Sequence, residues 1–144
     1  MEVLKTYNLF LDDIRSLEEA HSYTLFAPFI DEHWKIVRNY DQFVSFVKRN
    51  FERHKAFPKF VAFDHDLADE HYSNAMFTDP DKYDGYYDNK FVEKTGLECA
   101  KWLIGFCMDN GLEFPDYYVH SMNPVGRQNI TSYIENYKKH CENE

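Results

Sequence analysis

The sequence predicts a three-layer α/β domain, with a mostly parallel sheet of about four strands and helices on both faces. From Trp34 onward, short apolar runs alternate with segments of helical spacing, as in strands joined by crossover helices. Three apolar runs also end in polar clusters, and open α/β sheets bind ligands at the carboxyl ends of their strands. At 144 residues, the chain is expected to form a single domain over residues 1–144.

The first two strands and their connection come from the amino-terminal part of the chain. Tyr7–Leu11 is predicted to be a buried strand, and Trp34–Val37 the second strand. The crossover between them, Ser16–His33, is expected to be irregular, because Ser16–Ala20 favours one helical turn and Pro28 interrupts the rest.

A helix, a strand and a long loop are expected next. Asp41 is predicted to cap a helix with apolar residues at helical spacing, namely Phe43, Val44, Phe46, Val47 and Phe51. Pro58 is expected to precede the third strand, Phe60–Phe63. A long loop packed by its own aromatic side chains is expected over Ala68–Lys94, and loops of this length are usually functional or mobile.

Capping signals mark the last two helices. Thr95 and Glu98 form a predicted capping box, and the helix that follows is expected to end near Gly111. Its predicted buried residues are Leu97, Ala100, Leu103, Ile104 and Cys107. After a fourth strand, Tyr117–Val119, Asn123 is predicted to cap the final helix.

Composition limits the classes of function. The formal charge of −9, from 16 basic and 25 acidic residues, argues against broad nucleic-acid binding, which depends on neutralising phosphates. The chain has no apolar run near the roughly 18 residues of a membrane span, and no signal peptide. Its three cysteines have no paired spacing, which suits a reducing compartment. We therefore expect a cytoplasmic domain without a membrane contact.

Carboxylates follow two of the predicted strands. Asp12 and Asp13 come directly after the first, and Asp64 and Asp66 follow the third. Hard cations such as Mg²⁺ and Mn²⁺ take carboxylate oxygens, and a cation removes the repulsion between neighbouring carboxylates. We favour this metal site over the alternative that these are ordinary turn residues. His65 could be a base, a metal neighbour or a buried strand residue.

A second polar cluster follows the fourth strand. His120 could act as a general acid or base, and Ser121 could hydrogen-bond a phosphoryl oxygen or act as a nucleophile. The helix that begins at Asn123 and includes Gly126 would offer free N–H groups to an anion. The alternative is a plain asparagine cap beside a buried histidine and serine. Beside the carboxylates, we favour a phosphate site.

Two arginines are further candidates for phosphate binding. Arg15, three residues after Asp12, could hold a phosphate in a bidentate grip or form a surface salt bridge. Arg127, in the first turn of the last helix, is a weaker candidate.

The polar clusters resemble those of a known family. The motifs concerned are Leu11-Asp12-Asp13-Ile14-Arg15, Phe63-Asp64-His65-Asp66-Leu67, Thr95-Gly96 and His120-Ser121-Met122-Asn123-Pro124-Val125-Gly126-Arg127-Gln128-Asn129. They are similar to the cyclic-phosphate processing receiver-like family, a divergent relative of the receiver domains of bacterial response regulators. The resemblance covers most of the chain and implies a flavodoxin-like fold.

The resemblance also implies roles for individual residues. In receivers the acidic pair after the first strand holds Mg²⁺, which fits Asp12 and Asp13. The aspartate ending the third strand is the phosphoacceptor, which fits Asp64, and the hydroxyl residue ending the fourth contacts the phosphoryl group, which fits Ser121. The sequence has no predicted fifth strand and no strand-end lysine, so a phosphorelay output is not expected.

The sequence therefore predicts a metal-dependent phosphoesterase acting on a small phosphate, such as a cyclic phosphate of a nucleotide or RNA end. Asp12, Asp13 and Asp64 are expected to hold the metal, with Asp66 as an outer or alternative ligand. Asp64 or a water would attack phosphorus, and His120 would pass a proton to the leaving oxygen. Two alternatives remain: a degenerate receiver that binds a phosphorylated ligand or protein without chemistry, and a true phosphoacceptor.

Overall fold

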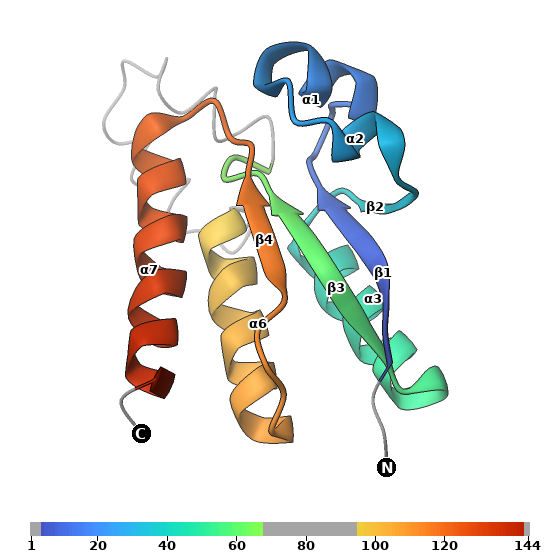
Figure 1. Ribbon diagram of the computed structural model, residues 1–144, viewed down its shortest axis with the longest axis vertical. Helices are drawn as coiled ribbons and strands as arrows, with labels where there is room; N and C mark the ends of the chain where they lie inside the picture. The colour runs from blue at the N-terminus through green and yellow to red at the C-terminus, as the bar shows by residue number, and fades with distance from the viewer. Residues whose placement is uncertain (1–3, 68–94, 143–144) are drawn as a thin grey trace, which may run out of the picture.

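The computed structural model describes residues 4–67 and 95–142, and its centre is a parallel sheet (Figure 1). The strands are β1 (Leu4–Leu11), β2 (Trp34–Val37), β3 (Ala56–Phe63) and β4 (Asp116–Val119). They lie in the order β2-β1-β3-β4, and all three neighbouring pairs are parallel. The predicted α/β class with a four-stranded parallel sheet is confirmed.

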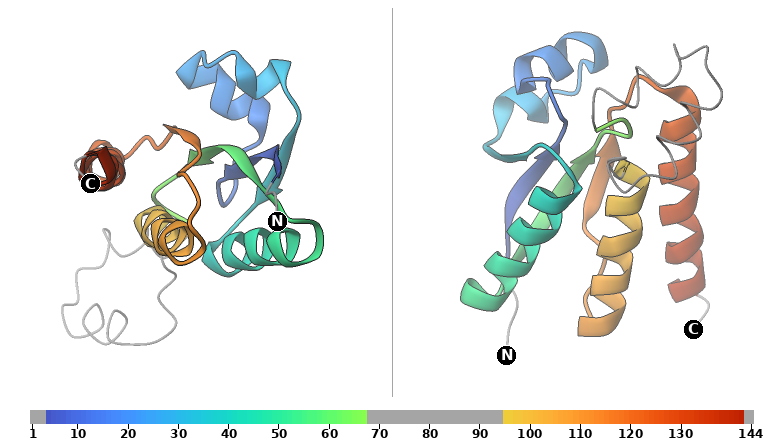
Figure 2. Two further views of the ribbon diagram at one scale, coloured as in Figure 1. Left: turned by 60° about the horizontal axis from the view of Figure 1, so that its bottom comes forward. Right: turned by 180° about the vertical axis from the view of Figure 1, so that it is seen from behind.

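Helices cover both faces of this sheet, as the sequence predicts. They are α1 (Leu17–Thr24), α2 (Pro28–Asp31), α3 (Tyr40–His54), α6 (Gly96–Asn110) and α7 (Pro124–Glu142). Figure 2 shows α3 and α6 on one face, α1 and α2 on the other, and α7 beside α6. The main core, which includes Leu9, Phe63 and Leu103, lies under α3 and α6. Phe10 and Phe29 belong to a second core under α1 and α2. None of the described helices is long and apolar enough to cross a membrane.

The first crossover is irregular, and it holds more helix than expected. Ser16 accepts a hydrogen bond from the backbone N–H of Glu19, whose side chain accepts one from the Ser16 N–H, so α1 begins with a capping box. Pro28 does not only interrupt this segment: it occupies the first turn of α2, where a missing N–H is not needed. The carbonyl of Pro28 accepts a hydrogen bond from the Trp34 indole at 2.8 Å, which ties the crossover to β2.

One predicted cap residue, one predicted capping hydrogen bond and one predicted strand boundary are wrong for local reasons. Asn39, not Asp41, caps α3, because its side chain accepts a hydrogen bond from the N–H of Gln42. Thr95 is the residue before α6, but its side chain makes no capping hydrogen bond. Pro58 lies within β3 and not before it. The β1–β3 register shifts around the position opposite Pro58, and such irregularities tolerate proline.

The remaining elements agree with the sequence. Asn123 caps α7, since its side-chain oxygen accepts a hydrogen bond from the Gly126 N–H at 3.0 Å. Of the residues predicted to be buried in α6, Leu97 is half-buried and the other four are buried. The expected loop over Ala68–Lys94 lies outside the described residues.

Candidate functional site

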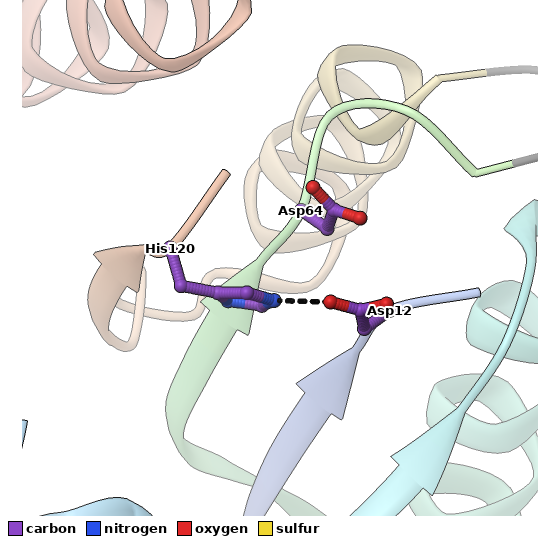
Figure 3. Close-up of side chains that lie close together, drawn as sticks. All are labelled: Asp12, Asp64 and His120. Atoms are coloured by element: carbon purple, nitrogen blue, oxygen red, sulfur yellow. Dashed lines mark hydrogen bonds and ion pairs between the residues drawn. The ribbon is translucent and has the colours of Figure 1, made fainter. Parts of the chain in front are cut away.

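Three buried polar side chains meet at the carboxyl ends of the strands (Figure 3). Asp12 follows β1, Asp64 follows β3 and His120 follows β4. The sheet ladder continues into them, because the Asp64 N–H donates to the Leu11 carbonyl and the His120 N–H donates to the Phe63 carbonyl, each at 3.0 Å. The backbone of three strands therefore sets their relative positions.

The atoms that could bind a ligand in this group lie close together. His120 Nε2 is 3.1 Å from Asp12 Oδ2, and one ligand atom from each of the three residues lies within 4.8 Å of the others. Asp12 Oδ1 accepts hydrogen bonds from the N–H groups of Ile14 and Arg15, at 3.1 and 2.9 Å. Asp64 Oδ1 accepts one from the next residue, whereas its buried Oδ2 accepts none within the described part of the chain.

Burial and charge set the protonation of the group. Burial, followed by the charge of Asp12, raises the pKa of Asp64 to about 8. Burial acts in the same direction on Asp12, but the hydrogen bond with His120 and those from the Arg15 and Ile14 N–H groups keep its pKa below the usual value. Burial lowers the pKa of His120, although its contact with Asp12 opposes this. At neutral pH a neutral imidazole therefore donates to an ionised Asp12.

This arrangement fits a divalent cation. Asp12, Asp64 and His120 form a buried group that could hold a metal ion. Burial and a neighbouring charge oppose ionisation of Asp64, and the charge of a bound cation would offset both effects. Asp64 Oδ2, which accepts no hydrogen bond from the described residues, would gain a direct ligand contact beside its ion pair with Arg15. Asp13 and Asp66, also predicted as ligands, are not part of this three-residue group.

Arg15 supplies positive charge beside the two carboxylates. Its Nη1 is 3.6 Å from Asp12 Oδ2 and 3.9 Å from Asp64 Oδ2. The guanidinium also lies 5.3 Å from the centre of the Tyr23 ring, and Nη2 contacts the sulfur of Met122 at 3.4 Å. Since Arg15 is only partly exposed, it is part of the site and not a surface salt bridge.

A small cavity is lined in part by Arg15. Its volume is about 190 Å³, and it is lined by Arg15, Asp64, Asp66, Ser121, Met122 and Asn123. We call it the phosphate cavity, after the phosphate-binding role that the sequence predicts for Arg15, Ser121 and Asn123. It brings together the sequence-predicted residues from the ends of β1, β3 and β4.

The segment after β3 is tied to the start of α7. Asp66 Oδ1 is 2.9 Å from His65 Nδ1, and Asp66 Oδ2 accepts a hydrogen bond from the Asn123 amide at 3.3 Å. Ser121 Oγ accepts one from the Asn123 N–H at 3.1 Å. The Gly126 N–H, proposed for phosphate, is used by the Asn123 cap.

Two glycines let helices approach this segment closely. A Cβ on Gly96 would lie 1.7 Å from the carbonyl oxygen of Asp64, and the Gly96 N–H donates to the His65 carbonyl at 2.7 Å. A Cβ on Gly126 would lie 2.3 Å from the His65 ring. These contacts give Gly96 and Gly126 a structural role, because the two glycines position the Asp64–Asp66 segment.

Some site residues were not found from the sequence. Arg38 Nη1 donates to the carbonyls of Asp12 and Arg15, at 3.0 and 2.7 Å, and so holds the turn after β1. Arg38 comes directly after β2, and this position at a strand end could have identified it as a site residue. The Tyr23 hydroxyl donates to the His120 carbonyl at 2.7 Å, but nothing in the sequence places α1 next to β4. Arg127 Nη1 donates to the Ser121 carbonyl at 3.3 Å and does not line the phosphate cavity.

The fold and the site together define a receiver-like domain, in which acidic residues gather at the carboxyl edge of a flavodoxin-like parallel sheet. A family model described as the cyclic-phosphate processing receiver domain matches residues 7–136. The chain belongs to this family. No curated protein and no solved structure matches the chain significantly. The family indicates involvement in cyclic-phosphate processing.

Proposed function

We propose that this domain holds a divalent metal ion, Mg²⁺ or Mn²⁺, and hydrolyses a small phosphate ester, such as a cyclic phosphate of a nucleotide or RNA end. One observation carries the proposal. A buried carboxylate, Asp64, lines a small cavity together with Arg15 and adjoins Asp12 and His120. Carboxylates that bind a cation and a guanidinium that binds an anion are the parts that phosphoryl chemistry needs.

The metal would be held by Asp12, Asp64 and His120, with His120 Nε2 giving up its hydrogen bond to Asp12 so that its lone pair could bind the ion. A bound divalent ion supplies positive charge that stabilises the charge developing on the phosphoryl oxygens. The imidazole nitrogen favours Mn²⁺ over Mg²⁺, because Mg²⁺ prefers oxygen ligands only. The His120 side chain has no exposed surface, so its role in this proposal is to bind and orient and not to meet the leaving group.

The other residues of the phosphate cavity would bind and orient the substrate. Arg15 would pair with a phosphoryl oxygen, and the Ser121 hydroxyl would donate to another. Asp66, held by His65 and Asn123, would take a proton from the attacking water. The water oxygen bonds to phosphorus, a P–O ester bond breaks, and this proton passes to the leaving oxygen.

Turnover of cyclic phosphates tests the proposal. The assay would present nucleoside and RNA-end cyclic phosphates with Mg²⁺ or Mn²⁺ to the wild type and to Asp64→Asn. The same change at the exposed Asp41 on α3 is a matched control. Metal-dependent product that is lost in Asp64→Asn and kept in Asp41→Asn is expected. Equal turnover by Asp64→Asn would refute the assignment.

A non-catalytic binding module is the second candidate. The ion pairs of Arg15 with both Asp12 and Asp64 favour it, because they already place a cation beside the carboxylates. In that case metal and a phosphorylated ligand would raise the melting temperature without any product.

A further inference from the structure

A second, larger cavity lies next to the phosphate cavity. Its volume is about 520 Å³, against about 190 Å³ for the phosphate cavity. It is lined by residues from the end of α1, the end of β4 and the start of α7, among them Tyr23, Thr24, Tyr118 and Arg127. Ser121 and Met122 line both cavities, so the two are adjacent along this segment.

The open position of β4 explains why this space is accessible. β4 lies at the edge of the sheet, and no further strand follows it among residues 120–142. Tyr118 on β4 and Tyr23 on α1 are both half-buried where they line the larger cavity. A group bound there would be adjacent to a phosphate held by Arg15.

The aromatic side chains of the larger cavity are held in place. The Tyr118 ring stacks on Phe26, with centroids 4.2 Å apart and an interplanar angle of 8°. The Tyr23 hydroxyl donates to the His120 carbonyl, and Arg15 lies over its ring. Rings that are already ordered lose little conformational entropy when a planar ligand packs against them.

The chemistry of the lining points to a planar, electron-rich ligand. Two tyrosine rings, a methionine and an arginine line the cavity, and none of its described lining side chains is acidic. Tyrosine and arginine are the side chains on which nucleobases stack, with little dependence on the base. The cavity is also much larger than the one beside Asp64, so a second phosphoryl group would fill it poorly.

We propose that this cavity holds the base of a nucleotide whose phosphate lies in the phosphate cavity. This inference rests on the proposed function and names its substrate class: a nucleoside phosphate in place of a base-free sugar phosphate. Tyr118 and Arg127 bind the base, and Ser121 and Met122 separate it from the phosphate.

Calorimetric binding in the presence of Mn²⁺ tests this assignment with three ligands. They are adenosine 5′-monophosphate, ribose 5-phosphate and inorganic phosphate. The nucleotide is expected to bind about tenfold more tightly than ribose 5-phosphate, as is typical for stacking of one base. Tyr118→Leu is expected to remove most of this difference. Tyr133→Leu, at an exposed tyrosine on α7 that does not line the cavity, is the matched control.

A second variant separates binding from folding. Tyr118 packs on Phe26, so Tyr118→Leu could also weaken the fold. Arg127 is exposed. Arg127→Ala is expected to weaken the binding of the nucleotide severalfold, and to weaken the binding of inorganic phosphate by less. Arg49→Ala, at an exposed arginine on α3, is its control.

The outcomes distinguish the two proposals. Tighter binding of the nucleotide that depends on Tyr118 and Arg127 supports the base site. Equal affinity for the nucleotide and ribose 5-phosphate overturns the base site and leaves the phosphate site standing. If no phosphate-bearing ligand binds with Mn²⁺ or Mg²⁺, the proposed function fails, and the base site fails with it.

Discussion

The charge on Asp64 makes the stability of the metal-free domain depend on pH. Burial and the charge of Asp12 raise the pKa of Asp64 from 3.8 to about 8 in the folded protein. The folded state therefore keeps a proton that the unfolded state releases, and stability falls as pH rises through this range. Burial lowers the pKa of His120, which has the opposite effect, but only below its ordinary value of 6.5. The interval from pH 6.5 to 8 therefore reports on Asp64.

The size of this effect follows from the two ends of the interval. One pKa unit corresponds to about 1.4 kcal/mol, and Asp64 is already half ionised at pH 8, so the wild type should lose roughly 1–2 kcal/mol of stability between pH 6.5 and 8. Asp64→Asn removes the titrating group, and its amide oxygen can still accept from the His65 N–H. This variant should lose little stability over the same interval and should exceed the wild type at pH 8.

Urea unfolding of the metal-free proteins at half-unit steps of pH measures this difference. Asp41→Asn, the same change at an exposed position, should keep the wild-type slope. A slope in Asp64→Asn equal to that of the wild type would refute the reasoning, since it would show that the pKa of Asp64 is not raised in the folded state.

Further predictions concern the metal, the close helix contact and the first cap. Mn²⁺ at a hundred times its dissociation constant should stabilise the wild type by about 2.7 kcal/mol in thermal unfolding, and should leave Asp64→Asn unchanged. Gly96→Ala places a Cβ 1.7 Å from the Asp64 carbonyl. It should destabilise the fold by about 2 kcal/mol and weaken Mn²⁺ binding. Gly105→Ala lies in the same helix, and its added Cβ has no atom of the described residues within 4 Å, so it should stabilise by up to about 1 kcal/mol. Equal effects of the two changes would contradict this account. Ser16→Ala should cost about 1 kcal/mol in urea unfolding through loss of the α1 cap, and no loss would show that this cap is dispensable.

Local patterns in the sequence determined the fold class and the edge that carries the site. Apolar runs such as Phe60–Phe63 are typical of strands in a sheet with both faces covered, and the carboxyl ends of parallel strands lie at one edge. Asp12, Asp64 and His120 follow such runs directly, so their meeting could be predicted. The Asn123 cap was predictable for the same kind of reason, because it depends on residues only three positions apart.

Tertiary structure decided which side chains join the group and which turn away from it. Asp66, like Asp64, is an aspartate that follows β3, yet its side chain contacts His65 and Asn123. Asn39 and Asp41 can both cap a helix, and the folded chain uses Asn39 as the cap of α3. The register shift between β1 and β3 allows Pro58 to lie within β3. The cavity beside Tyr118 depends on how α1, β4 and α7 pack together. Contacts between residues about a hundred positions apart, such as Tyr23 with His120, leave no spacing in the sequence, so only the folded chain reveals them.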